Sequence, residues 1–382
     1  MKLLMISGDR SILQRKQGAF WYTLQELRKH FDRIDVICPR IPKASRNGDA
    51  MTHGGESALV GGSVYFHPCP WSLCFQSRWI IRKGRELVST FGHDVATVHE
   101  YPPFYNGMGA ARLAAKIRIP YALEIHHIVG MPRASSLMEW IGWLLSRLYL
   151  SRDARSANAV RVVNEKVGRQ LMKWGVPEKK ISVVPSFYLD KKLLTSIERP
   201  PIIYDVAFCG RIVTNKGLRK LIEVVHSLHG VRLVIIGDGP LRTKCEDLVR
   251  SLGMQNRVAF LGWMPDLEAV LGAVASASIF VMCSRSEGGP RSVLEAMAIG
   301  MPVVATPVGV VPEIIKDGVN GVITTGEPED LAKKIRMLLS DSAMRERMAK
   351  EAPKILDTFE RGKLIKEYAD FLKSLATEKK KG

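Results

Sequence analysis

Two glutamates, Glu287 and Glu295, are separated by seven residues in a segment that reads Glu-Gly-Gly-Pro-Arg-Ser-Val-Leu-Glu-Ala-Met-Ala. A helix is expected to begin near Pro290, because proline is tolerated at the first helical position. The free N–H groups at such a helix start favour a phosphate or an electron-rich oxygen. The two carboxylates could then hydrogen-bond hydroxyls at the two ends of a nucleotide sugar. A helix cap and a surface acid would show the same spacing.

Two cations, Arg211 and Lys216, are five positions apart in a turn bounded by Gly210 and Gly217. They could converge on one diphosphate, whose departure builds negative charge that a metal or fixed cations must neutralise. The sequence contains no Asp-x-Asp motif for a divalent metal. We therefore expect no metal and no bound cofactor, with these cations holding the phosphates. The competing interpretation is a pair of exposed turn residues.

The elements that must position these residues alternate between short apolar runs and helical patterns, as in parallel sheets built from strand–helix–strand units. Expected helices include 19–30, 109–117 and 362–375. The expected strands are 2–7, 33–38, 95–99, 121–126, 159–163 and 181–184 in the first half, and 205–209, 232–236, 258–261, 279–283, 302–305 and 321–324 in the second.

The fold class expected from this pattern is α/β, with two doubly wound Rossmann-like domains that face each other across a cleft. A chain of 382 residues suits two domains at roughly 150 residues each. Tandem prolines at 200–201 mark the linker, so the expected domains are 1–198 and 199–361. Residues 362–382 are expected to return to the first domain, and 39–62 to form a mobile loop. Ligands would bind where the strands of both sheets end.

The formal charge of +18 is concentrated in the first half of the chain. Residues 1–200 hold 30 Lys and Arg against 16 Asp and Glu, a balance of +14. This favours an anionic partner or, more simply, a solvated basic face. The stretch 74–85 mixes aromatic residues with four cations, which suits an anionic membrane surface or a basic helix whose apolar stripe is buried. No nucleic-acid motif accompanies the charge, so nucleic acid is not expected as a partner.

The six cysteines show no Cys-x-x-Cys spacing, which is typical of a protein from a reducing compartment. No signal peptide is recognised at the N-terminus. The longest apolar stretch, 137–150, is interrupted by Glu139 and Arg147 and falls short of the ~20 residues of a membrane span. We expect a cytoplasmic protein with peripheral contact to the inner face of the cell membrane.

The acidic segment at 287–298 and the Gly-Met-Pro-Val-Val that follows at 300–304 resemble the retaining glycosyltransferase family 4. Its hallmark is two glutamates separated by seven residues, followed by a small-residue helix and a Gly-x-Pro-Val-Val strand. The resemblance implies the two-domain fold called GT-B, with the acceptor in the first domain and the donor in the second. It implies transfer of a sugar from a UDP- or GDP-sugar, with retention, to a hydroxyl that we expect on a lipid-linked or cell-surface glycan.

The resemblance also assigns roles to the candidate residues of the donor site. It implies that Glu295 holds the donor ribose and that Glu287 contacts the transferred sugar near its reacting carbon. Arg211 and Lys216 are implied to clamp the phosphates. Backbone amides after Glu287 are implied to bind the sugar and the diphosphate, and Pro290 has no N–H to offer. The candidates for this contact are Gly288, Gly289, Arg291 and Ser292.

Further candidates depend on the same resemblance. Gly18 matches the start of a Gly-Gly motif that approaches the donor phosphate, although residue 19 is alanine. Trp263 follows a strand in the loop that reads the nucleobase, or is simply packed. His126, six residues after Pro120, is implied to lie beside the transferred sugar and stabilise charge, where a lone histidine would more often be structural. His99 is a candidate for the acceptor side.

Two other classes of protein remain open. A nucleotide-sugar epimerase can share this fold, but it would need a second set of acid and base groups, which the sequence does not show. A basic nucleic-acid-binding protein would explain the charge, yet it would leave the paired glutamates and the phosphate turn without a use.

Overall fold

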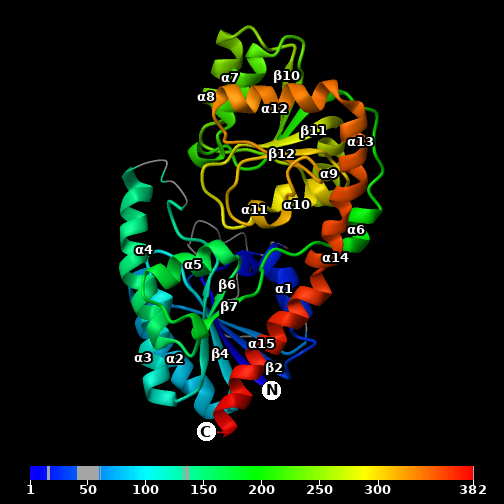
Figure 1. The fold of residues 1–382 in the computed structure, drawn as a ribbon. Helices are drawn as coiled ribbons and strands as arrows, with labels where there is room; N and C mark the ends of the chain where they lie inside the picture. Colours follow the sequence, from blue (N-terminus) through cyan, green and yellow to red (C-terminus); the bar gives the residue numbers. More distant parts are fainter. Residues whose placement is uncertain (15–17, 41–59, 61, 132–133, 135–136, 382) are drawn as a thin grey trace. The chain divides into compact units, whose positions relative to one another are not determined.

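The computed structural model describes residues 1–14, 18–40, 60, 62–131, 134 and 137–381, so most of the loop expected at 39–62 lies outside the described residues. The chain divides into two compact units (Figure 1). The first unit comprises residues 1–128, 141–186 and 362–382, and the second comprises 129–140 and 187–361. Both ends of the chain therefore belong to the first unit, and the second unit is inserted between them.

The first unit is built on a seven-stranded parallel sheet with the order β3-β2-β1-β4-β5-β6-β7. Its central strands are mostly apolar and are buried on both faces, which is typical of a parallel sheet covered by helices on both sides. The strands are β1 (Lys2–Ile6), β2 (Arg33–Cys38), β3 (Val64–Pro68), β4 (Val95–His99), β5 (Tyr121–Ile125), β6 (Ala159–Val162) and β7 (Ile181–Val183).

Helices cover this sheet, and the last helix of the chain is one of them. Its residues Tyr368, Ala369 and Leu372 are almost completely buried. The helices and short 3-10 turns of the unit are η1 (Ile12–Gln14), α1 (Ala19–Leu27), η3 (Leu73–Phe75), α2 (Gln76–Phe91), α3 (Tyr105–Ile117), α4 (Leu137–Ser156, whose first four residues are grouped with the second unit), α5 (Glu165–Lys173), η4 (Glu178–Lys180) and α15 (Arg361–Lys381).

The second unit is built on a six-stranded parallel sheet with the order β10-β9-β8-β11-β12-β13. Its core packs helix residues such as Leu221 and Leu331 against strand residues such as Val206 and Ile279. The strands are β8 (Tyr204–Cys209), β9 (Leu233–Ile236), β10 (Val258–Gly262), β11 (Ala277–Met282), β12 (Val303–Ala305) and β13 (Val322–Ile323).

The connections of this second sheet are mostly helical. Asp266 and Asp341 cap two of these helices by accepting hydrogen bonds from the N–H groups of Ala269 and Met344, both at 2.8 Å. The elements are α6 (Lys191–Thr195), η5 (Thr214–Lys216), α7 (Leu218–Ser227), α8 (Arg242–Ser251), α9 (Leu267–Ala275), α10 (Arg291–Ala298), α11 (Val311–Ile314), α12 (Pro328–Ser340), α13 (Ser342–Glu351), η6 (Ala352–Lys354) and α14 (Ile355–Phe359).

Both sheets have the strand order of a doubly wound fold, which confirms the expected fold class. In each sheet the chain leaves the first strand in one direction and later returns to its other side, so the order reverses between β1 and β4 and between β8 and β11. Ligands of such sheets bind beyond the carboxyl ends of the strands at the reversal point. Among the described helices, none is long and apolar enough to cross a membrane.

Candidate functional site

The reversal point of the second sheet joins the two motifs found in the sequence. The Arg211–Lys216 turn follows β8, and the segment that carries Glu287 follows β11, the strand paired with β8. The two segments are hydrogen-bonded directly. Arg285 donates its backbone N–H to the carbonyl of Asn215 at 2.8 Å, and Asn215 Nδ2 donates to the carbonyl of Ser286 at 3.1 Å. Residues about 70 positions apart in the sequence thus lie together beyond the carboxyl ends of two neighbouring strands.

A glycine makes this close approach possible. Gly217 has φ of 71°, in the left-handed region, and a Cβ added there would lie 2.5 Å from the carbonyl oxygen of Cys283. Any other residue would be strained and would also push the two segments apart. Gly217 therefore sets the distance between the cation turn and the acidic segment.

Lys216 and Glu287 form an ion pair between Nζ and Oε1. Both side chains are largely covered, with exposed fractions of 19% and 14%. Arg211 is exposed, and within the described part of the chain its side chain has no hydrogen bond or ion pair. The two predicted cations thus lie on one turn, but only Lys216 contacts the acidic motif.

Helix α10 begins directly after this pair, with Pro290 as its N-cap. The predicted helix start is therefore confirmed within one residue. The N–H groups of Arg291 and Ser292 fall in the first turn, where helix amides have no partner within the helix. A negative charge beside this turn would be stabilised by these amides and by the helix dipole.

Glu295 lies one helical turn after Arg291 and accepts a hydrogen bond from Arg291 Nε at 2.7 Å. Its residue is only 8% exposed. Burial raises the pKa of Glu295, because it disfavours the charged carboxylate, and the nearby Arg291 partly offsets this effect. Glu295 is thus not the surface acid of the simpler interpretation. It lies close to the carboxyl end of β8, where its charge contributes to raising the pKa of the Cys209 thiol to about 12, an effect that comes mainly from burial.

The glycines between the two glutamates are tightly packed. A Cβ on Gly289 would lie 2.1 Å from the ring of Phe187, and a Cβ on Gly309 would lie 2.4 Å from the carbonyl oxygen of Gly288. Phe187 also packs against Phe359, with ring centroids 5.7 Å apart. The Gly-Gly turn is therefore held in place by the surrounding protein.

Trp263 and Gly18 have open surroundings. Trp263 directly follows β10 and is 78% exposed, so its indole is not packed in the core. Gly18 is the N-cap of α1, with φ of −99°. Among the described residues, a Cβ added there would approach only Ser11 Oγ, at 4.0 Å. The described residues of the first unit therefore leave room for a side chain at position 18.

The first unit carries a cluster of titratable residues at its own sheet edge. His126 follows β5 and lies 3.2 Å from Glu124 Oε2, and the ring of His99, at the end of β4, lies 5.3 Å from its ring. His99 Nε2 is 3.4 Å from Glu124 Oε1. The side chain of His126 is 43% exposed. Desolvation lowers the pKa of His126, although the Glu124 carboxylate opposes this, so the imidazole is neutral at pH 7.

Glu124 is the centre of this cluster and was not among the predicted site residues. It is fully buried and accepts hydrogen bonds from Thr97, from Tyr368 of α15, and from Arg161 Nη1 at 2.6 Å. Burial alone would raise the pKa of Glu124, but His99, Arg161 and His126 outweigh it and hold that pKa well below its ordinary value. The signal in the sequence was the alternation along β5, which places Glu124 and His126 on one face.

The two clusters offer different chemistry. The second unit combines a cation, a helix start and two carboxylates, which can bind a diphosphate and the hydroxyls of sugars. The first unit offers a neutral imidazole held by an ionised carboxylate. In the described part of the chain, no group of three or more His, Cys, Asp or Glu side chains is placed to hold a metal ion.

Comparison with known proteins identifies the class of protein that has this fold and these residues. The model of Glycosyltransferase Family 4 matches residues 20–188, and the model of Glycosyl transferases group 1 matches residues 197–355. An uncharacterized glycosyltransferase of Methanocaldococcus jannaschii is 36% identical over 344 residues, which are 83% of this chain and 86% of that protein. The chain therefore belongs to the glycosyltransferases of group 1 and family 4, as its resemblance implied.

Two further similarities show how far the likeness extends. The lipopolysaccharide core biosynthesis glycosyltransferase LpsE of Rhizobium meliloti is 34% identical over 188 residues, 49% of this chain and 54% of LpsE. The chain thus matches about half the length of this relative. The crystal structure of Anabaena Alr3699/HepE in complex with UDP has a TM-score of 0.69 and 19% identity, covering 98% of this chain and 100% of that one. This similarity extends to the fold alone, which is GT-B.

Proposed function

We propose that this chain is a retaining glycosyltransferase that moves a sugar from a nucleotide-diphosphate sugar to an acceptor hydroxyl. The observation that carries the proposal is the contact between Lys216 and Glu287 beside the first turn of α10. This arrangement provides a cation and free amides for the diphosphate and a carboxylate for the sugar. UDP is bound in the HepE structure, so UDP is the first nucleotide to test as part of the donor.

Each candidate residue has a role in this proposal. Lys216 and Arg211 bind the diphosphate together with the amides of Arg291 and Ser292 and the backbone after Glu287. Glu287 binds the transferred sugar, and Glu295 binds the donor ribose, for which a buried carboxylate that already accepts one hydrogen bond is well suited. Trp263 contributes an exposed surface beside the base. His126 acts as a neutral hydrogen-bonding partner of the sugar.

The proposed reaction is a front-face substitution. The bond between the sugar C1 and the phosphate oxygen breaks while a bond forms between C1 and the acceptor oxygen on the same face, so configuration is retained. The acceptor proton passes to an oxygen of the leaving diphosphate. Negative charge grows on that diphosphate, and fixed cations and helix amides stabilise it without the cost of reorganising solvent.

The acceptor and the location of the enzyme are part of the same proposal. We place the acceptor hydroxyl on a lipid-linked or cell-surface glycan, which agrees with the lipopolysaccharide substrate in the name of LpsE. We place the enzyme in the cytoplasm, in peripheral contact with the membrane. The first domain, expected over 1–198, would bind the acceptor, and the second, over 199–361, the donor.

The Lys216→Ala variant tests the phosphate assignment. Its turnover should fall by more than ~10-fold, since loss of one preorganised charge contact costs ~3 kcal/mol. Arg219→Ala is the matched control, because it removes a cation that is 78% exposed three residues along the chain. The assignment fails if Lys216→Ala keeps near-normal turnover.

Nucleotide release separates a transferase from an epimerase. With UDP-sugars and GDP-sugars as substrates, free nucleoside diphosphate should accumulate only when an acceptor is supplied. An epimerase would convert one nucleotide sugar into another and release no nucleotide. A screen of nucleotide diphosphates by thermal unfolding would identify the base, because a specific ligand stabilises the fold by mass action.

A further inference from the structure

Helix α4 carries most of its apolar side chains on its outer face. Leu137 is 72% exposed and Leu148 is 65% exposed, although both are large and apolar. On the opposite side of the helix, Ser146 and Asp153 are almost completely buried, together with Leu150. The residues of this outer face of α4 are Leu137, Met138, Trp140, Ile141, Leu144, Leu145 and Leu148.

This arrangement is the reverse of that in a helix that faces water. A surface helix normally turns its apolar stripe to the core and its polar residues outward. Here the buried hydroxyl of Ser146 is satisfied within the helix, by donating to the carbonyl of Gly142 at 2.7 Å. Scattered exposed apolar residues are ordinary, but a continuous patch marks a surface for a partner or a membrane. The outer face of α4 is therefore built for surroundings other than water.

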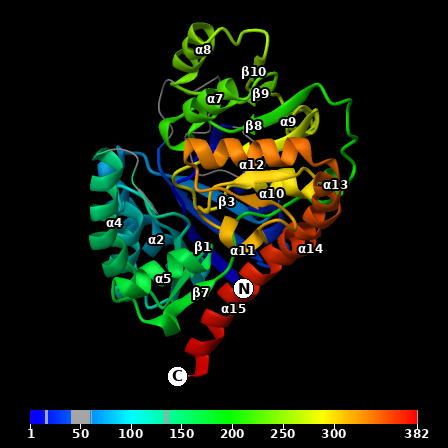
Figure 2. The same ribbon diagram turned by 45° about the horizontal axis from the view of Figure 1, so that its top comes forward.

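Cations lie on the same helix and on its neighbours. Arg147, Arg152 and Arg155 are exposed on α4 itself. Helix α3 packs beside it, because Tyr149 of α4 stacks on Phe104, the N-cap of α3, with ring centroids 5.2 Å apart. Helix α3 in turn packs against α2 (Figure 1), and Figure 2 shows α4 from a second direction.

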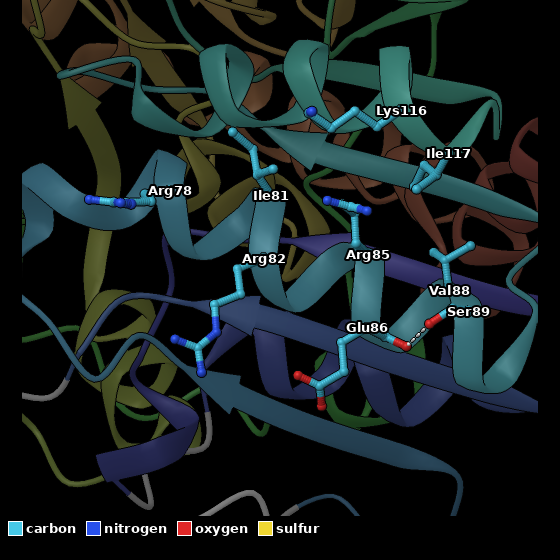
Figure 3. Close-up of a pocket in the computed structure, with 9 residues that line it drawn as sticks. All are labelled: Arg78, Ile81, Arg82, Arg85, Glu86, Val88, Ser89, Lys116 and Ile117. Carbon is cyan, nitrogen blue, oxygen red and sulfur yellow. Dashed lines mark hydrogen bonds between the residues drawn. The ribbon is translucent and has the colours of Figure 1, made fainter.

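A basic groove of about 670 Å³ lies between α2 and α3 (Figure 3). Its only carboxylate among the described lining residues is Glu86, which is paired with Lys83. The apolar stripe of α2 itself, including Ile80 and Leu87, is buried, so α2 presents charge to the outside and little apolar surface. The residues that line the groove are Arg78, Ile81, Arg82, Arg85, Glu86, Val88, Ser89, Lys116 and Ile117.

We propose that the outer face of α4 inserts into the boundary between the headgroups and the acyl chains of an anionic lipid bilayer. The arginines of α4 and the basic groove bind the lipid phosphates. Apolar side chains and cations on one layer of helices are the combination that binds such a surface, and Trp140 suits the interface because it is both apolar and a hydrogen-bond donor. The charge favours a bilayer over a protein partner, since the patch is bordered by arginines. This proposal deepens the membrane contact included in the proposed function.

Flotation with vesicles tests the proposal. The full chain should float with vesicles of phosphatidylcholine and phosphatidylglycerol, and much less with phosphatidylcholine alone. Leu144→Ser combined with Leu148→Ser should reduce binding by about tenfold or more, since both side chains are exposed and their apolar area drives insertion. Val319→Ser is the matched control, because it removes an exposed apolar side chain from the second unit. Arg78→Gln combined with Arg82→Gln should weaken binding only to the anionic vesicles.

Three results would overturn the proposal. One is failure of the full chain to float with anionic vesicles at low salt, and another is equal flotation of the α4 double variant. The third is a chain that is oligomeric by light scattering and becomes monomeric in the α4 variant, which would assign the face to a second copy. Thermal unfolding with and without UDP distinguishes failure of the membrane proposal from failure of the proposed function. The α4 variant should keep its stabilisation by UDP, and a chain that floats but is not stabilised by any nucleotide would refute the function alone.

Discussion

At the scale of single residues, a second buried acid deserves comparison with Glu124. Glu100 follows β4 and is 5% exposed, and Asp153 of α4 is 1% exposed. A Cβ on Gly107 would lie 2.0 Å from Glu100 Oε2 and 2.6 Å from Asp153 Oδ2, so the two carboxyl groups converge on one point. Burial, and then the charge of Asp153, raise the pKa of Glu100 to about 8. Glu124 is ionised because donors and cations surround it, whereas burial and Asp153 outweigh the backbone N–H groups and Arg152 near Glu100, which stays protonated at neutral pH.

This difference predicts how stability depends on pH. Because the pKa of Glu100 is higher in the folded chain than in the unfolded one, the folded state binds more protons between about pH 5 and pH 8. The free energy of unfolding should therefore decrease as the pH rises through this range, by up to about 1.4 kcal/mol per pH unit. Glu100→Gln should reduce that slope, because its neutral amide can still accept from the N–H of Tyr101.

Urea unfolding at several pH values measures the slope for both chains. Asp153, whose pKa burial also raises, adds to the slope in the same direction and stays in the variant. Identical slopes for wild type and Glu100→Gln would show that Glu100 is ionised in the folded protein.

At the scale of elements, the turns after the strands decide the geometry of the site. Gly217→Ala should strain the left-handed backbone by roughly 1–2 kcal/mol and force apart the two segments that hold Lys216 and Glu287. We expect a lower melting temperature and a large loss of turnover.

Gly18→Ala is the contrasting variant, because the nearest atom that the added methyl group meets among the described residues is Ser11 Oγ, at 4.0 Å. The melting temperature should change little. If the donor phosphate approaches the backbone there, KM for the donor should rise at nearly constant stability. Unchanged donor kinetics in Gly18→Ala would remove Gly18 from the proposed site.

Most of the strands could be predicted from the sequence. All twelve expected strands are present, with ends that differ by at most two residues, because buried parallel strands are short apolar runs bounded by turn residues. The edge strand β3 (Val64–Pro68) was missed. It carries His67 and ends in proline, which only an edge tolerates, and it follows a polar stretch that was expected to be a loop.

The candidate site was predictable in its local positions where spacing along the chain carries the information, as for Glu287, Glu295 and Lys216, whose roles are proposals. It was not predictable where distant elements meet. The partners of Glu124 come from β4, β6 and α15, and no local pattern relates Glu124 to Tyr368. The outer face of α4 was missed for a related reason. An apolar helix shows in its sequence how much apolar surface it has, but not which side the rest of the protein covers.

At the scale of the whole molecule, the last helix completes the first unit. Arg161 stacks on the ring of Tyr368, with its guanidinium carbon 3.8 Å from the ring centroid, and Tyr368 donates its hydroxyl to Glu124. Removal of residues 362–382 should therefore unfold the first unit, because it exposes a large apolar area and removes one of the hydrogen bonds to the buried Glu124 carboxylate.

Hydrogen exchange measures this effect strand by strand. In the chain that ends at Arg361, the amides of β4, β5 and β6 should lose their protection, while those of β8, β9 and β11 should keep it. Equal protection in both sheets of the shortened chain would contradict the role given to α15.

The order of the units along the chain has a consequence for synthesis on the ribosome. Residues 187–361 are continuous, so the second sheet can be completed as soon as that stretch has emerged. The strands of the first sheet are translated earlier, but Tyr368 is translated only after residues 187–361. Until Tyr368 has emerged, Glu124 lacks the hydrogen bond from the Tyr368 hydroxyl. The amino-terminal half of the nascent chain therefore matures after the half that follows it, and an early stop codon would release a protein with a finished second unit and an incomplete first unit.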